Sequence, residues 1–277
     1  MAKRTRIDCD GTRGAGGEPV IQYQGIYKSF DHPVLSGVDL TIDRGEMFAI
    51  FGPSGTGKSV LLKTTIGLIT PDRGDVRVEG ESVYRADAGA LERIRRKVGY
   101  VFQNAALFDS LTVHGNVVMG IPEAVLAKEP KKERDRRVWE DLERVNLEPR
   151  HVLGKLPSEL SGGMRKRVGI ARAIVGRPSI LLWDEPTTGL DPVNSAAVER
   201  LIRGLSEELE VTSVLVTHDI EGGLLICDRV AMLDMGGLRF CGTPQQFRES
   251  EDTIVRAFVS RAAAQAALAA HLVESTI

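Results

Sequence analysis

The sequence predicts an α/β fold in which short buried strands and helices build a mainly parallel sheet. Phe48–Phe51 is an apolar run that stops at a glycine-rich loop, and Ser59–Ile69 then carries apolar residues at helical spacing. Ser179–Trp183 and Thr212–Thr217 are two further apolar runs, typical of strands buried on both faces of a parallel sheet. Together these three observations favour a sheet covered by helices.

The remaining elements follow from the same patterns. Val20–Tyr23 and the alternating Val38–Ile42 predict strands before the first glycine-rich loop, and Gly74–Val83 resumes β character after it. Near the other end, Arg229–Asp234 and Leu238–Cys241 flank a short glycine-containing turn, which is typical of a hairpin.

The predicted organisation is one domain with two different ends. Residues 1–17 are polar and glycine-rich and predict a flexible leader, and residues 18–250 predict a single domain without internal repeats. Within it, residues from about 105 to 175 are rich in charge and helix formers, which indicates an inserted helical subdomain. Residues 251–277 predict a helical tail, which packs either on its own domain or on a partner.

Composition excludes some classes of protein. The 277 residues carry a formal net charge of −2, so nothing favours the strongly basic face that wraps nucleic acid. No run approaches the roughly 18–20 apolar residues of a membrane-spanning helix, and no apolar secretory segment follows Met1. We therefore expect a chain that does not itself cross a bilayer and does not bind nucleic acid.

A phosphate-binding loop is the first chemical motif. Glycines let backbone N–H groups point at a phosphate, the following helix start adds a favourable dipole, and a lysine supplies a point charge. The alternative is a chance glycine-rich turn before a helix, and the strand and helix that flank the motif argue against it. The residues that fit G-x-x-x-x-G-K-[ST] are Gly52, Pro53, Ser54, Gly55, Thr56, Gly57, Lys58 and Ser59.

Further polar residues follow the predicted strands. Asp184 and Glu185 end an apolar strand, where one carboxylate can serve Mg²⁺ and the other an attacking water; alone, the pair is as typical of a helix start. His218 ends the next strand along the chain, although a histidine in that place is more often structural. Gln103 follows Val98–Phe102, where an amide could reach a metal or water, and by itself is weak support.

A second anion-binding helix start lies in Leu160–Met164, where Ser161, Gly162 and Gly163 open a helix with a basic continuation. One nucleotide needs only one phosphate loop. The second helix start therefore suggests a contact with a nucleotide that is bound to a partner subunit. The alternative is an ordinary capped helix with a basic exposed face.

In order, these motifs resemble the ATP-binding cassette (ABC) family from about Val20 to Phe247. The resemblance implies a P-loop NTPase (RecA-like) core with an N-terminal antiparallel β subdomain and an inserted helical subdomain, and it implies ATP and Mg²⁺ as ligands. The matching positions are Phe30 for the adenine-stacking aromatic, Gly52–Ser59 for Walker A, Gln103 for the Q-loop, Leu160–Met164 for the signature, Ile180–Asp184 for Walker B with Glu185 following, Gly189–Asp191 for the D-loop and His218 for the switch histidine.

The resemblance also implies a role for each residue. Lys58 and the loop amides as far as Val60 would bind phosphates, and Ser59, Gln103 and Asp184 would serve the metal. Glu185 would be the general base or position the water, and His218 would contact the γ-phosphate. Ser161, Gly162 and Gly163, with Asp191 of the D-loop, would close over the nucleotide of a second copy in a head-to-tail dimer.

The family further implies a transmembrane permease partner and a peripheral location on the cytoplasmic face of the inner membrane. Met164, in place of the usual glutamine, together with Ala105–Thr112 and Val60–Lys63, resembles the lipid-transport ATPases that work with mammalian-cell-entry (MCE) proteins and a small accessory subunit. The alternatives are a small-solute importer or exporter, a cassette acting on ribosomes or DNA, and a non-hydrolysing regulatory cassette. Glu185 and His218 argue against the last of these.

Overall fold

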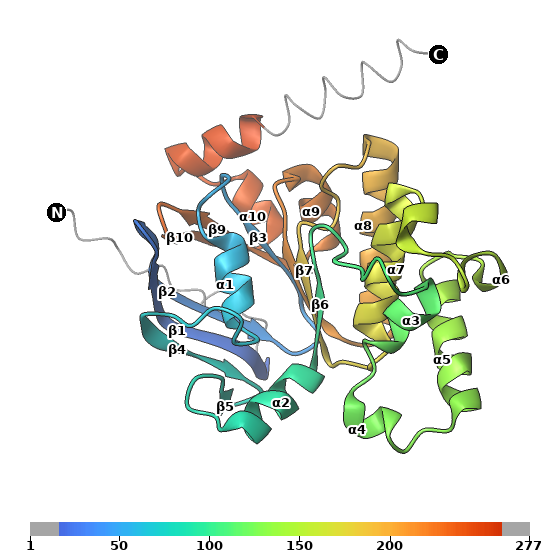
Figure 1. Cartoon of the computed structure of the whole chain (residues 1–277). Coiled ribbons are helices and arrows are strands. Elements are labelled where there is room, and N and C mark those ends of the chain that lie inside the picture. The colour runs from blue at the N-terminus through green and yellow to red at the C-terminus, as the bar shows by residue number, and fades with distance from the viewer. Residues whose placement is uncertain (1–16, 262–277) are drawn as a thin grey trace, which may run out of the picture. The chain divides into compact units, whose positions relative to one another are not determined.

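The computed structural model describes residues 17–261 (Figure 1), and these divide into two compact units. Unit 1 holds the described residues up to Leu91 and those from Val214 onward, whereas unit 2 is Glu92–Ser213. One boundary falls within α2 (Ala88–Arg96) and the other within β8 (Thr212–Val216). The predicted leader, except for Gly17, and the tail after residue 261 lie outside the described residues.

One sheet of unit 1 is antiparallel. β1 (Pro19–Ser29) pairs with β2 (Pro33–Asp43) and β4 (Arg73–Val78), and β5 (Glu81–Ser82) extends the edge, giving the order β2-β1-β4-β5 (Figure 1). β1 is longer than the predicted Val20–Tyr23 because it continues through a register shift between Tyr23 and Ile26. Gly25 lies in this irregular segment with a φ of 59°, a conformation that glycine adopts without cost.

The second set of strands in unit 1 has the order β10-β9-β3-β8. β3 (Met47–Phe51) is buried along its whole length and runs parallel to β9 (Arg229–Asp234), whereas β10 (Gly237–Gly242) pairs antiparallel with β9 and confirms the predicted hairpin. Phe247 of α10 (Pro244–Arg248) packs against Phe51, with 5.6 Å between ring centroids. The strand that precedes the phosphate-loop is therefore held by two elements that lie about 180 residues or more further along the chain.

α1 (Lys58–Thr64) is shorter than the predicted Ser59–Ile69. Gly67 adopts a φ of 64°, and the N–H groups of Gly67 and Leu68 bond back to the carbonyls of Thr64 and Lys63. This is how a helix commonly ends at a glycine, so the apolar spacing continues beyond the helix itself. α9 (Ile220–Ile226) is a further helix of this unit.

Unit 2 contains a parallel strand pair and most of the helices. β6 (Val98–Val101) pairs with β7 (Ile180–Asp184) over four residue pairs, from Val98 opposite Ile180 to Val101 opposite Trp183. Helices fill the region where the sequence predicts the helical insertion. They are α3 (Val113–Val118), α4 (Glu123–Leu126), α5 (Lys131–Arg144), α6 (Pro149–Val152), a 3₁₀ turn at Pro157–Glu159 and α7 (Gly162–Ile174), followed after β7 by α8 (Pro192–Glu208).

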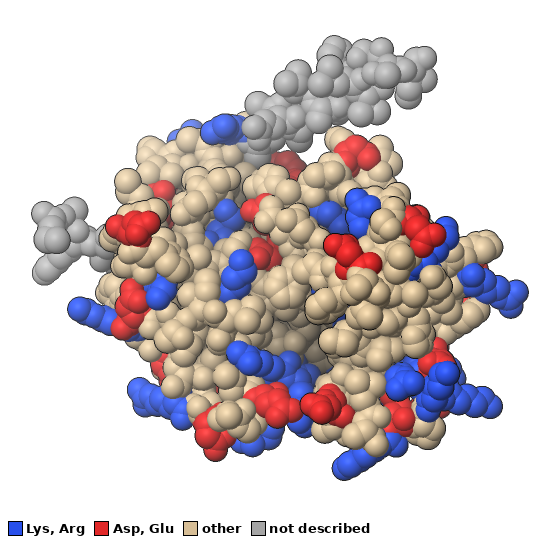
Figure 2. Space-filling view, in the orientation of Figure 1, with Lys and Arg blue, Asp and Glu red and all other residues tan. Residues whose placement is uncertain are grey.

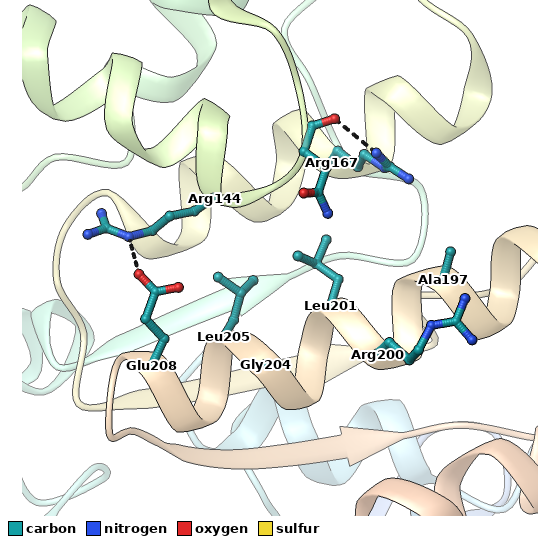
Figure 3. Close-up of a pocket in the computed structure, with 9 residues that line it drawn as sticks. Arg144, Arg167, Ala197, Arg200, Leu201, Gly204, Leu205 and Glu208 are labelled. Atoms are coloured by element: carbon teal, nitrogen blue, oxygen red, sulfur yellow. Dashed lines mark hydrogen bonds and ion pairs between the residues drawn. The ribbon is translucent and has the colours of Figure 1, made fainter.

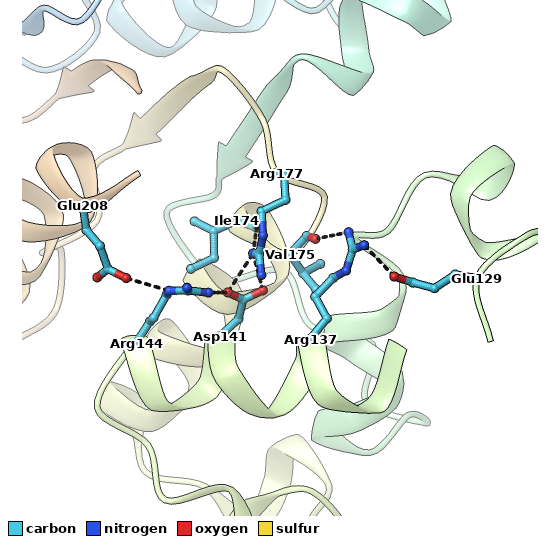
Figure 4. Close-up of polar contacts among 8 residues, drawn as sticks. All are labelled: Glu129, Arg137, Asp141, Arg144, Ile174, Val175, Arg177 and Glu208. Atoms are coloured by element: carbon cyan, nitrogen blue, oxygen red, sulfur yellow. Dashed lines mark hydrogen bonds and ion pairs between the residues drawn. The ribbon is translucent and has the colours of Figure 1, made fainter. Parts of the chain in front are cut away.

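A buried carboxylate ties three parts of unit 2 together (Figure 4). Asp141 of α5 is fully buried and accepts from Arg144, 2.7 Å away, and from Arg177 beyond the end of α7, also 2.7 Å away. Arg144 reaches on to Glu208 of α8 at 2.8 Å. Because a buried carboxylate needs compensating partners, the shared arginines hold α5 against the ends of α7 and α8.

Positive and negative side chains are intermixed on the face seen in Figure 2, as the net charge of −2 leads one to expect. In residues 17–261, no helix combines the length and the apolar character that crossing a membrane requires.

Candidate functional site

In unit 1, the phosphate-loop Gly52–Ser59 connects β3 to α1, as the motif predicts. Two of its glycines are required by their surroundings. A Cβ on Gly52, whose φ is 150°, would lie 2.4 Å from the carbonyl oxygen of Leu233, and one on Gly57, whose φ is 96°, would lie 2.7 Å from the side chain of Leu35. The loop therefore has a backbone path that only glycine permits at these two positions.

Lys58 is the first residue of α1 and is 4% exposed. Its Nζ donates to the carbonyl oxygens of Gly52 at 2.8 Å and Pro53 at 3.0 Å, so the ammonium lies over the loop. Gly57 is the N-cap and offers no side chain to the first turn of the helix. A positive ammonium beside an uncapped helix start fits a phosphate group.

Two other predicted residues of unit 1 lie at its surface. Phe30 is 57% exposed, and the Nζ of Lys28 lies 5.3 Å from the centroid of its ring. An exposed aromatic ring in this position is suited to stacking on a planar base. His218 follows β8, is exposed, and immediately precedes Asp219, which caps α9 by accepting from the N–H of Gly222.

In unit 2, Asp184 ends β7 and is 3% exposed. The hydroxyl of Tyr100, on the neighbouring β6, donates to its Oδ2 at 2.8 Å. A hydroxyl from Ser59, an amide oxygen from Gln103 and a carboxylate from Asp184 are all hard oxygen donors, so the chemistry of the predicted donor set fits Mg²⁺.

Glu185 lies directly after β7 with a φ of 49°, an uncommon conformation for a residue other than glycine. Its Oε2 accepts from the hydroxyl of Thr188 at 2.8 Å. Lys166 of α7 donates to the carbonyl oxygens of Pro186 at 2.7 Å and Thr188 at 2.5 Å. Burial lowers the pKa of Lys166, and the charge of Glu185 acts in the opposite direction.

The signature segment, Leu160–Met164, opens α7. Ser161 is the N-cap and accepts from the N–H of Met164 at 3.3 Å. Ser161 and Gly162 are exposed, and a Cβ on Gly163 would meet no atom within 4 Å. The helix start is therefore open to a ligand. Asp191 caps α8 in the same way, and the backbone and side-chain N–H groups of Asn194 lower its pKa.

Gln103 is exposed just beyond β6, and the chain after it is held by two residues that the sequence did not single out. Arg172 donates to the carbonyl oxygens of Ala105 and Ala106, which both have positive φ, and burial lowers the pKa of Arg172. Asn116, fully buried, bonds to both the N–H and the carbonyl oxygen of Phe108. Phe108 itself remains 50% exposed.

Unit 2 also contains a recess of about 430 Å³ between its helices (Figure 3). Leu201 and Leu205 of α8 point toward Arg144 and Arg167 on the opposite wall, and Asn146 also lines the recess. None of the predicted site residues lines it. The recess is therefore a feature of the helical part of unit 2.

Sequence reasoning missed Tyr100, Thr188, Lys166, Arg172 and Asn116. Thr188 contacts Glu185, three residues away. Tyr100, Lys166 and Arg172 contact residues at least 20 positions away in the chain, and no spacing rule identifies such contacts. For the basic residues after the signature segment, the sequence predicts at most an exposed basic helix face. Lys166 is instead half-buried and directed at the residues after β7.

A glycine-shaped phosphate-loop between a strand and a helix, with acidic residues ending a second strand, defines a nucleotide-binding protein of the P-loop class. Residues 35–188 match the family model described as ABC transporter, and the chain belongs to that family.

Solved cassettes share the fold. The dimeric ATP-binding cassette MJ0796, in a post-hydrolysis state with ADP and Pi, matches with a TM-score of 0.73 and 33% identity over 81% of this chain and 98% of that one. CbiO1 of Clostridium perfringens, part of the transporter complex cbiONQ, matches with a TM-score of 0.75 and 30% identity over 87% of this chain and 95% of that one. These neighbours confirm the predicted cassette fold with its antiparallel β subdomain.

Import ATP-binding proteins are among the curated relatives. The methionine import protein MetN of Caulobacter vibrioides is 43% identical over 220 residues, which are 78% of this chain and 65% of MetN. The sulfate/thiosulfate import protein CysA of the same organism is 42% identical over 245 residues, which are 87% of this chain and 70% of CysA. The chain thus spans 65% of the length of MetN.

These relatives do not support the predicted likeness to lipid-transport ATPases or an MCE partner; they favour the alternative of a small-solute importer. The contacts that the structure shows at these positions are made by backbone atoms. Ala105 and Ala106 are fixed by Arg172, and the N–H of Met164 belongs to the cap of α7. Backbone contacts of this kind do not depend on which side chains occupy these positions.

Proposed function

We propose that the chain is the ATP-binding and ATP-hydrolysing subunit of an ABC transporter that imports a small polar solute. The observation that carries the proposal is the phosphate-loop of an ABC-family chain. The buried Lys58 donates to the carbonyl oxygen of Gly52 in this loop, and Gly52 and Gly57 are positions where a side chain would clash with its surroundings. Import of a small solute rests on the relatives, whose names refer to methionine and to sulfate or thiosulfate.

In this proposal the residues divide the work of phosphoryl transfer to water. Lys58 and the amides of the phosphate-loop bind phosphates, and Phe30 stacks on the base. Glu185 accepts the proton of the attacking water or orients it, and His218 contacts the terminal phosphate. Ser59, Gln103 and Asp184 would hold Mg²⁺, which supplies charge neutralisation at the phosphates.

A second copy of the chain completes the proposed assembly. The open helix start at Ser161–Gly163 is an anion site that its own phosphate-loop does not require, so it would serve the nucleotide of the other copy. A permease would bind the exposed surface around Phe108, after Gln103, and keep the cassette peripheral to the membrane. The cytoplasmic face of the inner membrane is the location that this arrangement implies.

Affinity purification of the native complex tests the cargo. We expect a multi-spanning permease together with a solute-binding protein, and ATP hydrolysis that rises when the solute is added to the reconstituted complex. Recovery of an MCE-domain protein with bound phospholipid would overturn small-solute import and leave the ATPase proposal standing. Absence of ATP hydrolysis in both the complex and the isolated chain would overturn the ATPase proposal.

A further inference from the structure

The short segment Glu185–Thr188 follows β7 and is held by a side chain from another element. Glu185 has a positive φ, and Pro186 and Thr187 are buried. Lys166 donates to the carbonyl oxygens of Pro186 and Thr188, the residues on either side of Thr187. The ammonium thus fixes the peptide group that precedes Thr187 and the peptide group that follows Thr188.

The segment turns back on Glu185 itself. The Thr188 hydroxyl donates to Oε2 of Glu185 at 2.8 Å, and the N–H of Thr188 reaches the carbonyl oxygen of Glu185 at 3.3 Å. Lys166 therefore reaches the carboxylate of Glu185 through one residue. Each link is a hydrogen bond within unit 2.

The strained backbone of Glu185 gives the hydrogen bonds of Lys166 a possible role in holding this segment. A residue other than glycine in the left-handed region costs free energy and persists only when its surroundings enforce it. Bonds from an ammonium to carbonyl oxygens are stronger than bonds between neutral groups, and the half-buried position of Lys166 limits competition from water. Lys166 is thus suited to enforce the backbone path that sets the direction of the Glu185 side chain.

We propose that Lys166 and Thr188 are positioning residues for Glu185, so that the signature helix α7 orients the carboxylate that handles the attacking water of the same subunit. The inference rests on the proposed ATP hydrolysis and names a determinant of its rate. Lys166 lies in the second turn of α7, and Ser161 caps the first. A shift of this helix end would move the donor that holds Glu185.

The test compares variants of the full chain by steady-state ATP hydrolysis. Lys166→Met keeps the length of the side chain and removes the donors, and Thr188→Val removes the hydroxyl at nearly constant shape. Each should lower kcat by about tenfold to a hundredfold, the usual scale for a misplaced catalytic group, with KM for ATP changed by less than about threefold. Thr188→Ser keeps the hydroxyl and should restore kcat to within about threefold of the wild type.

Two further measurements separate positioning from a merely structural role. Lys166→Met should accumulate the ATP-bound dimer in light scattering, because binding persists while hydrolysis slows. The double variant should be no more than about threefold slower than Lys166→Met alone, since both residues act in one chain of contacts. Arg203→Gln, which removes an exposed arginine paired with Glu207, is the matched control and should leave kcat unchanged.

Multiplicative losses in the double variant, or wild-type kcat in Thr188→Val, would overturn the inference. If Lys166→Met fails to fold by circular dichroism, the Thr188→Val and Thr188→Ser pair decides alone. Glu185→Gln separates the two proposals. A large loss in Glu185→Gln with normal turnover in both Lys166→Met and Thr188→Val would overturn only the positioning role, whereas normal turnover in Glu185→Gln would overturn the catalytic role on which it rests.

Discussion

Two loops that follow buried strands, one in each unit, reach their shapes by different means. The phosphate-loop after β3 depends on glycines, with positive φ at Gly52, Gly55 and Gly57, and its lysine belongs to the motif itself. The segment after β7 begins with Glu185 in a positive φ and is held by Lys166, which belongs to α7. The backbone determines the first loop, and a side chain from elsewhere determines the second.

The difference has a consequence for substitution. A glycine-shaped loop should fail when a Cβ is added, because backbone atoms cannot move aside cheaply. A loop held by a side chain should keep its fold when that side chain is trimmed and lose the orientation of the group it carries. The experiments below test this contrast, from the largest expected effect to the smallest.

Glu185→Gln should have the largest effect on turnover. The amide keeps the shape of the side chain but cannot accept a proton, so ATP hydrolysis should fall by roughly two to four orders of magnitude. Nucleotide binding, measured by equilibrium dialysis, should persist, and the ATP-bound dimer should accumulate. Near-normal phosphate release from a preparation free of other ATPases would contradict the assignment.

Gly52→Ala should damage the phosphate-loop through its backbone. The new Cβ would lie 2.4 Å from the carbonyl oxygen of Leu233, at a φ of 150°. We expect a loss of about 3 kcal/mol in the free energy of unfolding, measured by chemical denaturation, together with loss of ATP binding. Gly55→Ala is the control, since its Cβ would meet no atom within 4 Å and only the φ of 82° opposes it, at about 1 kcal/mol. Equal losses in the two variants would refute a backbone-determined loop.

Lys58→Met should weaken nucleotide binding and leave the fold intact. Its ammonium would exchange the carbonyl oxygens of Gly52 and Pro53 for phosphate oxygens, and a charged hydrogen bond of this kind is worth about 1.5–3 kcal/mol. ATP affinity measured by calorimetry should therefore fall by about tenfold to a hundredfold. Lys63→Met, which removes the basic residue in the last turn of α1, should change affinity by less than about twofold. A Lys58→Met protein that binds ATP as tightly as the wild type would remove Lys58 from the site.

The elements of the fold also differ in how well the sequence predicts them. β3, the phosphate-loop, β7 and the β9–β10 hairpin are where the sequence predicts them, because the pattern that indicates each of them is contiguous in the chain. α1 ends earlier than the sequence predicts, since apolar spacing continues past the glycine that ends the helix. β1 was predicted too short, because its pairing continues through an irregular register.

The candidate site divides in the same way. Its motif residues could be named from local patterns, with Asp184 and Glu185 at the end of β7 and Ser161 at the start of α7. The residues that hold these motif residues in place could not be named from the sequence. Tyr100 lies 84 residues from Asp184 in the chain, and Lys166 meets Thr188 only through the fold of unit 2. Such contacts depend on tertiary packing, which a single sequence does not reveal.

The smallest effect is expected at Tyr100, where a side chain supports Asp184 from the neighbouring strand. The Tyr100 hydroxyl donates to Oδ2 of Asp184 at 2.8 Å in a buried setting, and its ring packs on Phe102 with 4.5 Å between centroids. Tyr100→Phe keeps the ring contact and removes the donor, at a cost of about 1 kcal/mol. If Asp184 serves the metal, the Mg²⁺ concentration that half-activates ATP hydrolysis should rise by up to about tenfold, the lower end for loss of a group that orients a metal ligand.

Tyr84→Phe provides the comparison that isolates the effect at Asp184. The Tyr84 hydroxyl donates to the carbonyl oxygens of Thr64 and Ile69 in unit 1, both at 2.6 Å, so its removal is the same chemical change away from Asp184. Both variants should lose similar stability in chemical denaturation, because each leaves a polar group short of a donor. Only Tyr100→Phe should change the Mg²⁺ requirement, since only that hydroxyl touches a predicted metal ligand. Equal shifts in the two variants would mean that the metal responds to general loosening of the fold, and the side chain on β6 would then have no specific part in holding Asp184.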